Sequence, residues 1–284
     1  MSLHTLAASA ILECRKYFKF KSVVDIGNQR ISFNEKLINR KIQNIDPKLD
    51  KFLVRPDWRT SPSGSQFYSH IGVNNYKCID LNSKDGAIIM DMNLNIKKSY
   101  SFNEQFDLVI NNGTSEHIFD QWQVFENLHN LTKVGGIILN IVPFLLWINH
   151  GFFNYNPIIF RDLAYSNNYS FNFMWIGHSD GYFKCFDPFS EVNLETKRSR
   201  PLSFFERNNL KLSGKKYSSI ESFVYKSLKN KGQLQIVSAY QKNSENEFST
   251  PLQGKWIHNI EINNSDVNLI KYFDQPDTYP QFHS

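Results

Sequence analysis

Glu116 and His117 follow an apolar run that begins at Phe106 and ends in small polar residues. Such a run is typical of a buried strand that delivers side chains to a site at its end. His150 comes soon after a second apolar run. Because the carboxyl ends of parallel strands meet at one edge of a sheet, we expect His117 and His150 to face one cavity. Each histidine is therefore a candidate catalytic base.

The loop after His150 is rich in aromatic and amide side chains that can recognise a small molecule. We expect a substrate-binding wall formed by Glu116, Phe152, Phe153, Asn154, Tyr155 and Asn156. The rings would stack on the acceptor, and the amides would bind its hydroxyl or carbonyl groups. The alternatives are structural: the rings pack in the core, and Glu116 with His117 caps a helix or orients the loop. No Cys/His spacing in the chain predicts a metal site.

The elements that would position these residues are strands alternating with helices, which indicates a parallel sheet with a ligand crevice at its carboxyl edge. The expected strands are 21–27, 76–82, 86–93, a run from Phe106, 135–144, 169–177 and 233–240. The expected helices are an amphipathic first helix with Leu3, Leu6, Ala10, Cys14 and Tyr17 on one face, a helix over 120–132 that stops at Gly135-Gly136, and a helix over 158–166. His129, on the second of these helices, is expected at the surface.

Two segments, 30–75 and 178–232, lack a clean periodicity and are interpreted as insertions. The first is expected to hold one short helix, and the second a helix near 219–230. The main domain is expected to span residues 1–248, with a C-terminal extension over 249–284.

The first three expected strands each place an aspartate near the carboxyl end, namely Asp25, Asp80 and Asp91. A first strand closed by glycine, here Gly27, and an acid at the end of the second strand form the layout of a nucleoside-binding fold, because the carboxylate accepts hydrogen bonds from ribose hydroxyls. A dinucleotide needs G-x-G-x-x-G, and the turn 27–30 has only the first of these glycines. The turn therefore favours S-adenosylmethionine, which has no phosphate, over a nicotinamide dinucleotide.

The motifs, taken in order, resemble those of class I S-adenosylmethionine-dependent methyltransferases. They are Val23–Gly27, Ile79-Asp80, Met90-Asp91, the run from Phe106 to Glu116-His117, and Val134–Leu139. The resemblance covers about residues 20 to 145. It implies a Rossmann-like α/β fold: a seven-stranded, mostly parallel sheet of order 3-2-1-4-5-7-6, with strand seven antiparallel, helices on both faces, and the two insertions added.

The resemblance also implies contacts to S-adenosylmethionine. Asp25 and Gly27 would lie beside its methionine part, although backbone N–H groups could instead bind Asp25 in a structural role. Asp80 would hold the ribose hydroxyls, and Asp91 with Met92 would flank adenine. The far side of the pocket would be lined by Asn111, Asn112 and Gly113. The chain departs from the family in its single-glycine turn and in the long spacing between the first strand and Asp80.

Composition and charge argue against several other classes of protein. The 284 residues, 41% of them hydrophobic, fit a globular α/β protein. A net charge of +5 without a long basic block argues against a nucleic-acid partner. The three cysteines are too few and too far apart for a disulfide framework, and no apolar segment is long enough to span a membrane. We therefore expect a cytoplasmic protein.

The predicted function is methyl transfer from S-adenosylmethionine to a small-molecule or sugar-like acceptor. Because the sulfonium is already activated, catalysis needs mainly in-line positioning, and proton removal where the acceptor is a hydroxyl. Two alternatives remain: an inactive binding or scaffold protein of the same fold and, less favoured, a nicotinamide-dependent oxidoreductase. The sequence leaves the identity of the acceptor and the oligomeric state open.

Overall fold

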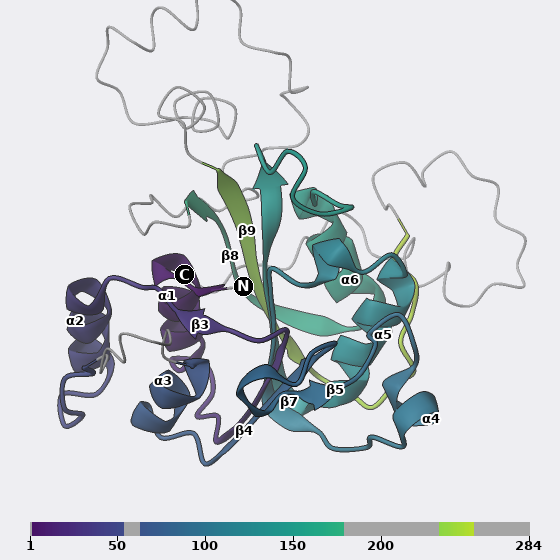
Figure 1. Ribbon diagram of the computed structural model, residues 1–284. Helices are drawn as coiled ribbons and strands as arrows, with labels where there is room; N and C mark the ends of the chain where they lie inside the picture. Colours follow the sequence, from purple (N-terminus) through teal and green to yellow (C-terminus); the bar gives the residue numbers. More distant parts are fainter. Residues whose placement is uncertain (1, 54–62, 179–232, 253–284) are drawn as a thin grey trace, which may run out of the picture.

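The computed structural model describes residues 2–53, 63–178 and 233–252, which build a central sheet with helices on both faces (Figure 1). Its strands are β1 (Ser2–Leu3), β2 (Ser22–Ile26), β3 (Arg30–Ile31), β4 (Asn75–Asp80), β5 (Ile88–Ile89), β6 (Phe106–Asn112), β7 (Thr132–Leu145), β8 (Tyr169–His178) and β9 (Leu234–Lys242). Its α-helices are α1 (Thr5–Cys14), α2 (Glu35–Ile45), α3 (Gly64–His70), α4 (Ile96–Tyr100), α5 (Gln121–Leu131) and α6 (Pro157–Ser166). Two short 3-10 turns are η1 (Lys84–Gly86) and η2 (Ser115–His117).

The main sheet has seven strands in the order β5-β4-β2-β6-β7-β9-β8. Numbered along the chain, these strands give the order 3-2-1-4-5-7-6. The pairs from β5 to β7 are parallel, whereas β9 pairs antiparallel with both β7 and β8. The predicted fold class, a Rossmann-like and mostly parallel sheet with one antiparallel strand, is therefore confirmed.

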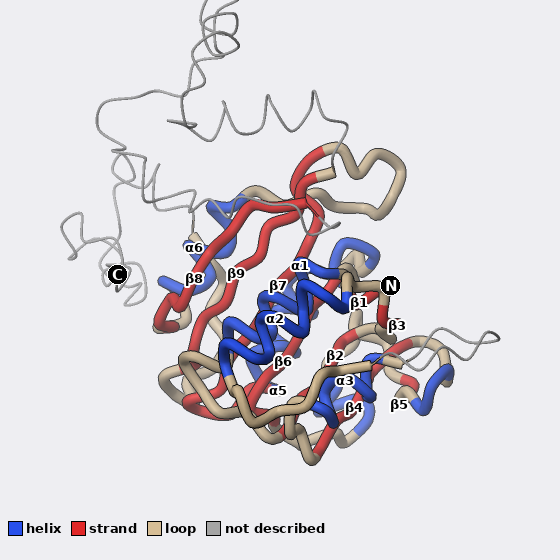
Figure 2. The backbone as a smooth tube through the Cα atoms, turned by 90° about the vertical axis from the view of Figure 1, so that its left-hand side faces the viewer, coloured by secondary structure: helices blue, strands red, loops and turns tan. Residues whose placement is uncertain are grey.

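Helices cover the two faces of this sheet in separate groups. Figure 1 shows α1, α2 and α3 on one side and α4, α5 and α6 on the other, and Figure 2 shows the first group lying in front of the strands. Leu108 packs in the core of the first group, and its neighbour Val109 in that of the second. Successive side chains of a strand point to opposite faces, so a strand covered on both sides must be apolar at nearly every position.

The register places the polar end of β6 between two other strand ends. Ile26, the last residue of β2, pairs with Asn111, and Asn112 pairs with Ile141 in β7. This position between β2 and β6 is where the strand order reverses direction along the chain. An open α/β sheet has its ligand crevice at such a point, outside the carboxyl ends of the strands.

The N-terminal region differs from the sequence-based expectation in two respects. Helix α1 is buried on nearly all sides, not only on one face, because it packs against both the sheet and α2. The described residues of the segment 30–75 form two helices where one was expected. The first of them, α2, has Asn34 as its N-cap, whose side chain accepts a hydrogen bond from the Leu37 N–H, and it buries Ile38 and Ile42.

Helix α5 ends earlier than the glycine pair suggested. It stops at Leu131, and β7 begins at Thr132, so Gly135 and Gly136 lie inside the strand. Gly135 has a φ of +79°, and a Cβ on Gly136 would lie 3.0 Å from the Asp107 carbonyl oxygen. The glycines therefore lie at the register shift between the pairs Phe106–Thr132 and Leu108–Ile137, and they do not terminate the helix.

The prediction that His129 lies at the surface is wrong. Its side chain is buried, with Nδ1 at 2.6 Å from the Tyr169 hydroxyl and Nε2 at 2.7 Å from the Asn246 carbonyl oxygen. The segment after β9 covers this side of α5, which no periodicity in the helix could show. The described start of the expected C-terminal extension also contacts the domain, because Trp122 donates to the Thr250 hydroxyl.

Several expectations fall on residues outside the described ranges: the insertion 178–232 almost entirely, its helix near 219–230, and the extension from residue 253. Within the described ranges, no helix is long and apolar enough to cross a membrane. Cys14 and Cys78 are both buried and free.

Candidate functional site

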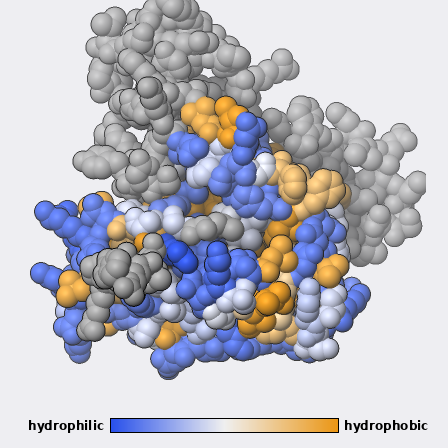
Figure 3. All heavy atoms as spheres, viewed as in Figure 1, coloured by the Kyte–Doolittle hydropathy of each residue, from blue (hydrophilic) through white to orange (hydrophobic). Residues whose placement is uncertain are grey.

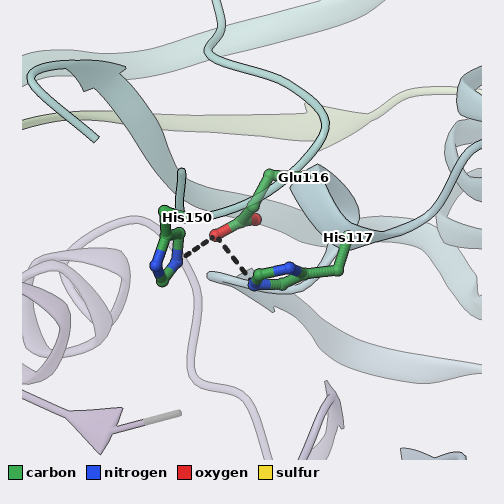
Figure 4. A group of neighbouring side chains, drawn as sticks. All are labelled: Glu116, His117 and His150. Atoms are coloured by element: carbon green, nitrogen blue, oxygen red, sulfur yellow. Dashed lines mark ion pairs between the residues drawn. The ribbon is translucent and has the colours of Figure 1, made fainter. Parts of the chain in front are cut away.

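Three side chains meet at the carboxyl edge of the sheet. Glu116 and His117 lie in η2, directly after β6, and His150 lies in the loop after β7. The Glu116 carboxylate lies between the two imidazoles (Figure 4), with its Oε1 at 3.5 Å from His150 Nε2 and 4.0 Å from His117 Nε2. The ring centroids of His117 and His150 are 4.9 Å apart. The loops after β6 and β7 therefore bring the two histidines side by side.

Burial separates Glu116 from its two neighbours. The Glu116 side chain is 1% exposed, whereas those of His117 and His150 are 40% and 37% exposed. Neither carboxylate oxygen of Glu116 accepts a hydrogen bond from any described residue. Burial raises the Glu116 pKa to about 7, and it also lowers the pKa of His117, together with the charge of His150. The cluster thus combines one buried acid with two solvent-accessible imidazoles.

Backbone contacts hold the two loops against each other. The Glu116 carbonyl oxygen accepts hydrogen bonds from the N–H groups of Phe152, at 2.7 Å, and Phe153, at 3.3 Å. Gly151 lies so close that a Cβ there would be 2.8 Å from the same carbonyl oxygen. Only glycine fits this approach without a shift of backbone, which explains its place next to His150.

A network of buried hydrogen bonds holds η2 in place. Asn111 accepts a hydrogen bond from the Ser115 N–H and donates to Ser115 Oγ, at 2.8 Å, and to Asn140 Oδ1, at 3.0 Å. The Tyr155 hydroxyl donates to Gln121 Oε1 and forms a second hydrogen bond with the Ser115 hydroxyl. Tyr155 and Asn111 therefore contact other parts of the protein, and their side chains position the turn that carries Glu116.

The remaining members of the expected acceptor wall are distributed around the cluster. Phe152 is 68% exposed, and its ring lies 6.0 Å from that of the exposed Phe119. Phe153 is half-buried, Asn154 is exposed, and Asn156 is the N-cap of α6. In Figure 3, hydrophobic residues gather at the top of this face, near the loop after β7. An apolar surface thus lies beside the imidazoles.

Asp80, the predicted ribose ligand, lies at the end of β4 and is half-buried. Its Oδ1 accepts from the N–H and the side-chain amide of Asn82, and its Oδ2 accepts from the Asn28 N–H at 2.7 Å. A carboxylate has about four acceptor positions, so Oδ2 retains one for a ligand hydroxyl. The Asp80 carboxylate can therefore accept one more hydrogen bond at this strand end.

The methionine end of the expected pocket is filled by the protein itself. Gly27 has a φ of +92° and opens the turn, but Gln29 stands where a G-x-G motif has its second glycine. The Gln29 side chain is 1% exposed and exchanges two hydrogen bonds with Asn112, at 3.0 and 2.8 Å. Gln29 was missed by the sequence reasoning, although the absent glycine was the signal that could have found it.

Asp25 makes a different set of contacts from either sequence-based alternative. Its two oxygens accept hydrogen bonds from the hydroxyls of Tyr68, at 3.0 Å, and Tyr76, at 2.9 Å. Burial raises the Asp25 pKa to about 7, although both tyrosine hydroxyls act in the opposite direction. In the structure as it stands, the carboxyl group is bound by tyrosines and not by backbone N–H groups.

The other predicted cofactor residues lie along the same edge. Met92 is buried in the core on the α5 side, whereas Asp91 is half-buried, with Oδ1 bound to Asn93. Gly113 has a φ of +69° and donates its N–H to the Ile141 carbonyl oxygen. Of this group, Asp91 has the more accessible side chain.

An open hollow of about 500 Å³ adjoins the cluster. It is lined by Ser2, His4, Thr5, Ser32, Phe33, Asn34 and Trp147. The Trp147 ring lies 4.7 Å from that of His150, so this tryptophan separates the hollow from the imidazoles. Trp147 was also missed by the sequence reasoning, because its role depends on contacts between loops.

No protein-family model matches the chain, and no curated protein sequence matches it. Solved structures with a similar fold include an S-adenosylmethionine-dependent methyltransferase from Archaeoglobus fulgidus, at 14% identity and a TM-score of 0.41 over 83% of this chain and 93% of that one. Another is phosphoethanolamine N-methyltransferase 2 from Haemonchus contortus, described in complex with S-adenosylmethionine, at 13% identity and a TM-score of 0.40 over 83% of this chain and 52% of that one. A third is an O-methyltransferase of a Brevibacillus brevis multienzyme, in complex with S-adenosylhomocysteine, at 11% identity and a TM-score of 0.34 over 82% and 71%. At such identities the likeness concerns the fold alone. The strand order independently agrees with the class I methyltransferase fold that the motifs resemble.

Proposed function

We propose that the protein transfers a methyl group from S-adenosylmethionine to a small-molecule acceptor. The observation that carries the proposal is Asp80, a carboxylate at the end of the second strand of a 3-2-1-4-5-7-6 sheet that retains an acceptor position for a hydroxyl. That is the place and the chemistry needed to hold the ribose of a nucleoside. Fold likeness alone would be an argument by analogy, because one fold serves many functions.

The residues would divide the work along the carboxyl edge. S-adenosylmethionine, when bound, supplies a methyl group already activated by its sulfonium. Asp80 would hold the ribose, and the half-buried Asp91 would lie beside the adenine. The exposed imidazoles of His117 and His150 would face the acceptor and take the proton from its nucleophilic atom. Their neighbour Phe152 would exclude water from that side.

The acceptor is assigned only as a small molecule. Exposed amide and aromatic side chains at Asn154 and Phe152 suit a molecule with both a hydroxyl and an apolar face. The exposed Phe119 beside Phe152 makes this surface as suitable for a purely apolar body as for a sugar ring. The sugar-like acceptor expected from the sequence therefore has no particular support.

Thermal unfolding with S-adenosylhomocysteine tests the proposal. A ligand that binds only the folded state at a hundredfold excess over its Kd adds about 2.7 kcal/mol, which corresponds to a rise in Tm of about 5 °C or more. We expect this rise with S-adenosylhomocysteine and none with NADH. The absence of any rise at millimolar S-adenosylhomocysteine would refute the proposal, and a rise with NADH alone would favour an oxidoreductase.

Substitution of Asp80 tests the site within that proposal. Asp80→Ala is expected to abolish the rise in Tm, because it removes the oxygen that would bind the ribose. Asp85→Ala is the matched control: this acid lies on the same edge and contacts Asn28 and Arg30, but has no assigned cofactor role. An equal response to S-adenosylhomocysteine in wild type and Asp80→Ala would show that the nucleoside binds elsewhere.

A second candidate, an inactive binding protein of this fold, is favoured by Gln29. Its buried amide fills the turn that the methionine part of the cofactor would occupy. An inactive protein would form no S-adenosylhomocysteine from S-adenosylmethionine with any acceptor in a screen. Turnover with one acceptor decides for the enzyme.

A further inference from the structure

The buried carboxylate of Glu116 lacks a hydrogen-bond partner among the described residues. Both of its carboxylate oxygens are buried and accept no hydrogen bond from the described part of the chain. A buried polar group without a partner destabilises the folded protein, and a charged one does so more strongly. The closest imidazole nitrogen is 3.5 Å away, beyond the usual length of a hydrogen bond to a carboxylate. The carboxylate oxygens of Glu116 are therefore available to a ligand that this position would accept.

The donor atoms around Glu116 have the composition of a metal site. One carboxylate oxygen and one nitrogen from each of His117 and His150 lie within 4.8 Å of one another. Donors about 2.1 Å from a tetrahedral ion are about 3.4 Å apart. The 3.5 Å between Glu116 Oε1 and His150 Nε2 is already close to that value, and His117 Nε2, at 4.0 Å, needs only a small ring movement.

We propose that Glu116, His117 and His150 bind a divalent transition-metal ion at the carboxyl edge of the sheet. Two imidazoles and one carboxylate suit Zn²⁺, Co²⁺, Fe²⁺ or Ni²⁺, whereas Mg²⁺ and Ca²⁺ prefer ligands that are all oxygen. The buried Glu116 is the fixed ligand, held by the backbone contacts of η2 to Phe152 and Phe153. The two exposed imidazoles adjust to the ion, and when they bind it, water held on the ion would replace the free imidazoles as the base for the acceptor's proton.

The site would leave coordination positions open. Three protein ligands are fewer than any of these ions takes, and open positions are typical of metal sites that bind a substrate or water. The exposed histidine rings and the neighbouring Phe152 mark the side from which a further ligand would enter. Cys/His spacing along the chain could not predict this arrangement, because the histidines come from loops after two different strands.

Cobalt(II) titration of the full chain, stripped of metal with a chelator, tests the inference. We expect one Co²⁺ per chain, a visible absorption band typical of four or five ligands, and displacement of the band by Zn²⁺. Mg²⁺ at the same concentration should not displace it. Changes of residues near a metal's ligands cost 10–100-fold in affinity, so loss of a ligand in Glu116→Gln should weaken binding by at least about a hundredfold.

Two further variants and one control complete the test. His117→Ala and His150→Ala change exposed side chains and should each weaken Co²⁺ binding without unfolding the protein, so they serve if Glu116→Gln fails to fold. The control is His70→Ala, which removes a histidine of α3 that is not part of the cluster. This variant should bind Co²⁺ with the same affinity as wild type. Equal affinity in wild type and in the three cluster variants would overturn the inference.

This test is independent of methyl transfer, because it needs neither cofactor nor acceptor. Binding of Co²⁺ by the cluster without a rise in Tm from S-adenosylhomocysteine would support the metal site and refute the proposed function. A rise in Tm with S-adenosylhomocysteine, without metal binding by the cluster, would support the proposed function and refute the metal site.

Discussion

Replacement of Asn111 by leucine, which has nearly the same shape, is expected to lower the free energy of unfolding by about 3 to 5 kcal/mol. The change leaves two buried groups without partners, the Ser115 N–H and the side-chain oxygen of Asn140, and it also removes one of the hydrogen bonds of the Ser115 hydroxyl. Each unpaired group costs about 1–3 kcal/mol. Because Ser115 is the first residue of η2, the same change releases the turn that carries Glu116 and His117.

Urea unfolding of wild type and Asn111→Leu measures the loss of stability, and the same samples can be titrated with Co²⁺. Asn103→Leu is the matched control, because Asn103 is exposed and bonds only to the Ser101 carbonyl oxygen. Its effect should remain within about 0.5 kcal/mol. An unchanged urea midpoint in Asn111→Leu would mean that the network contributes nothing to stability.

The positions of the strands along the chain were predictable because each buried strand is an apolar run that ends in a polar residue, whereas their order in the sheet was implied by the resemblance to the methyltransferase family. Strand β6 shows this directly: its residues from Leu108 to Ile110 are apolar and pack on both faces of the sheet, and the polar Asn111 follows, level with the end of β2. The same reasoning placed His117 and His150 at one edge, where they were found 4.9 Å apart. The local sequence pattern and the strand topology both place these residues at the carboxyl edge of the sheet.

Predictions failed where the partner of a side chain comes from a segment without periodicity. His129 lies off the apolar stripe of α5, but the chain after β9 crosses it and binds its Nε2. Asp25 has a tyrosine partner on α3, in a segment interpreted as an insertion. The contacts of Gln29 could not be predicted, because the sequence does not show which side chain occupies the space near the turn. Each of these contacts joins segments far apart in the chain.

Asp25 provides the clearest expected dependence of stability on pH. Burial raises its pKa in the folded protein from 3.8 to about 7, so between these pH values the folded chain holds a proton that the unfolded chain has released. The stabilisation is therefore complete below pH 4 and is lost as the pH rises through 7. One pKa unit corresponds to about 1.4 kcal/mol, so the loss is on the order of 4 kcal/mol.

Asp25→Asn should remove this dependence, because asparagine keeps the shape of the protonated acid and stays neutral at every pH. Wild type and variant are expected to be similarly stable at pH 4, and the variant more stable by on the order of 4 kcal/mol at pH 8. Urea unfolding at several pH values measures the difference between the two proteins, in which the contributions of all other groups cancel. A variant that becomes less stable than wild type as the pH rises would show that Asp25 is ionised in the fold, with the hydroxyls of Tyr68 and Tyr76 sufficient to stabilise its charge.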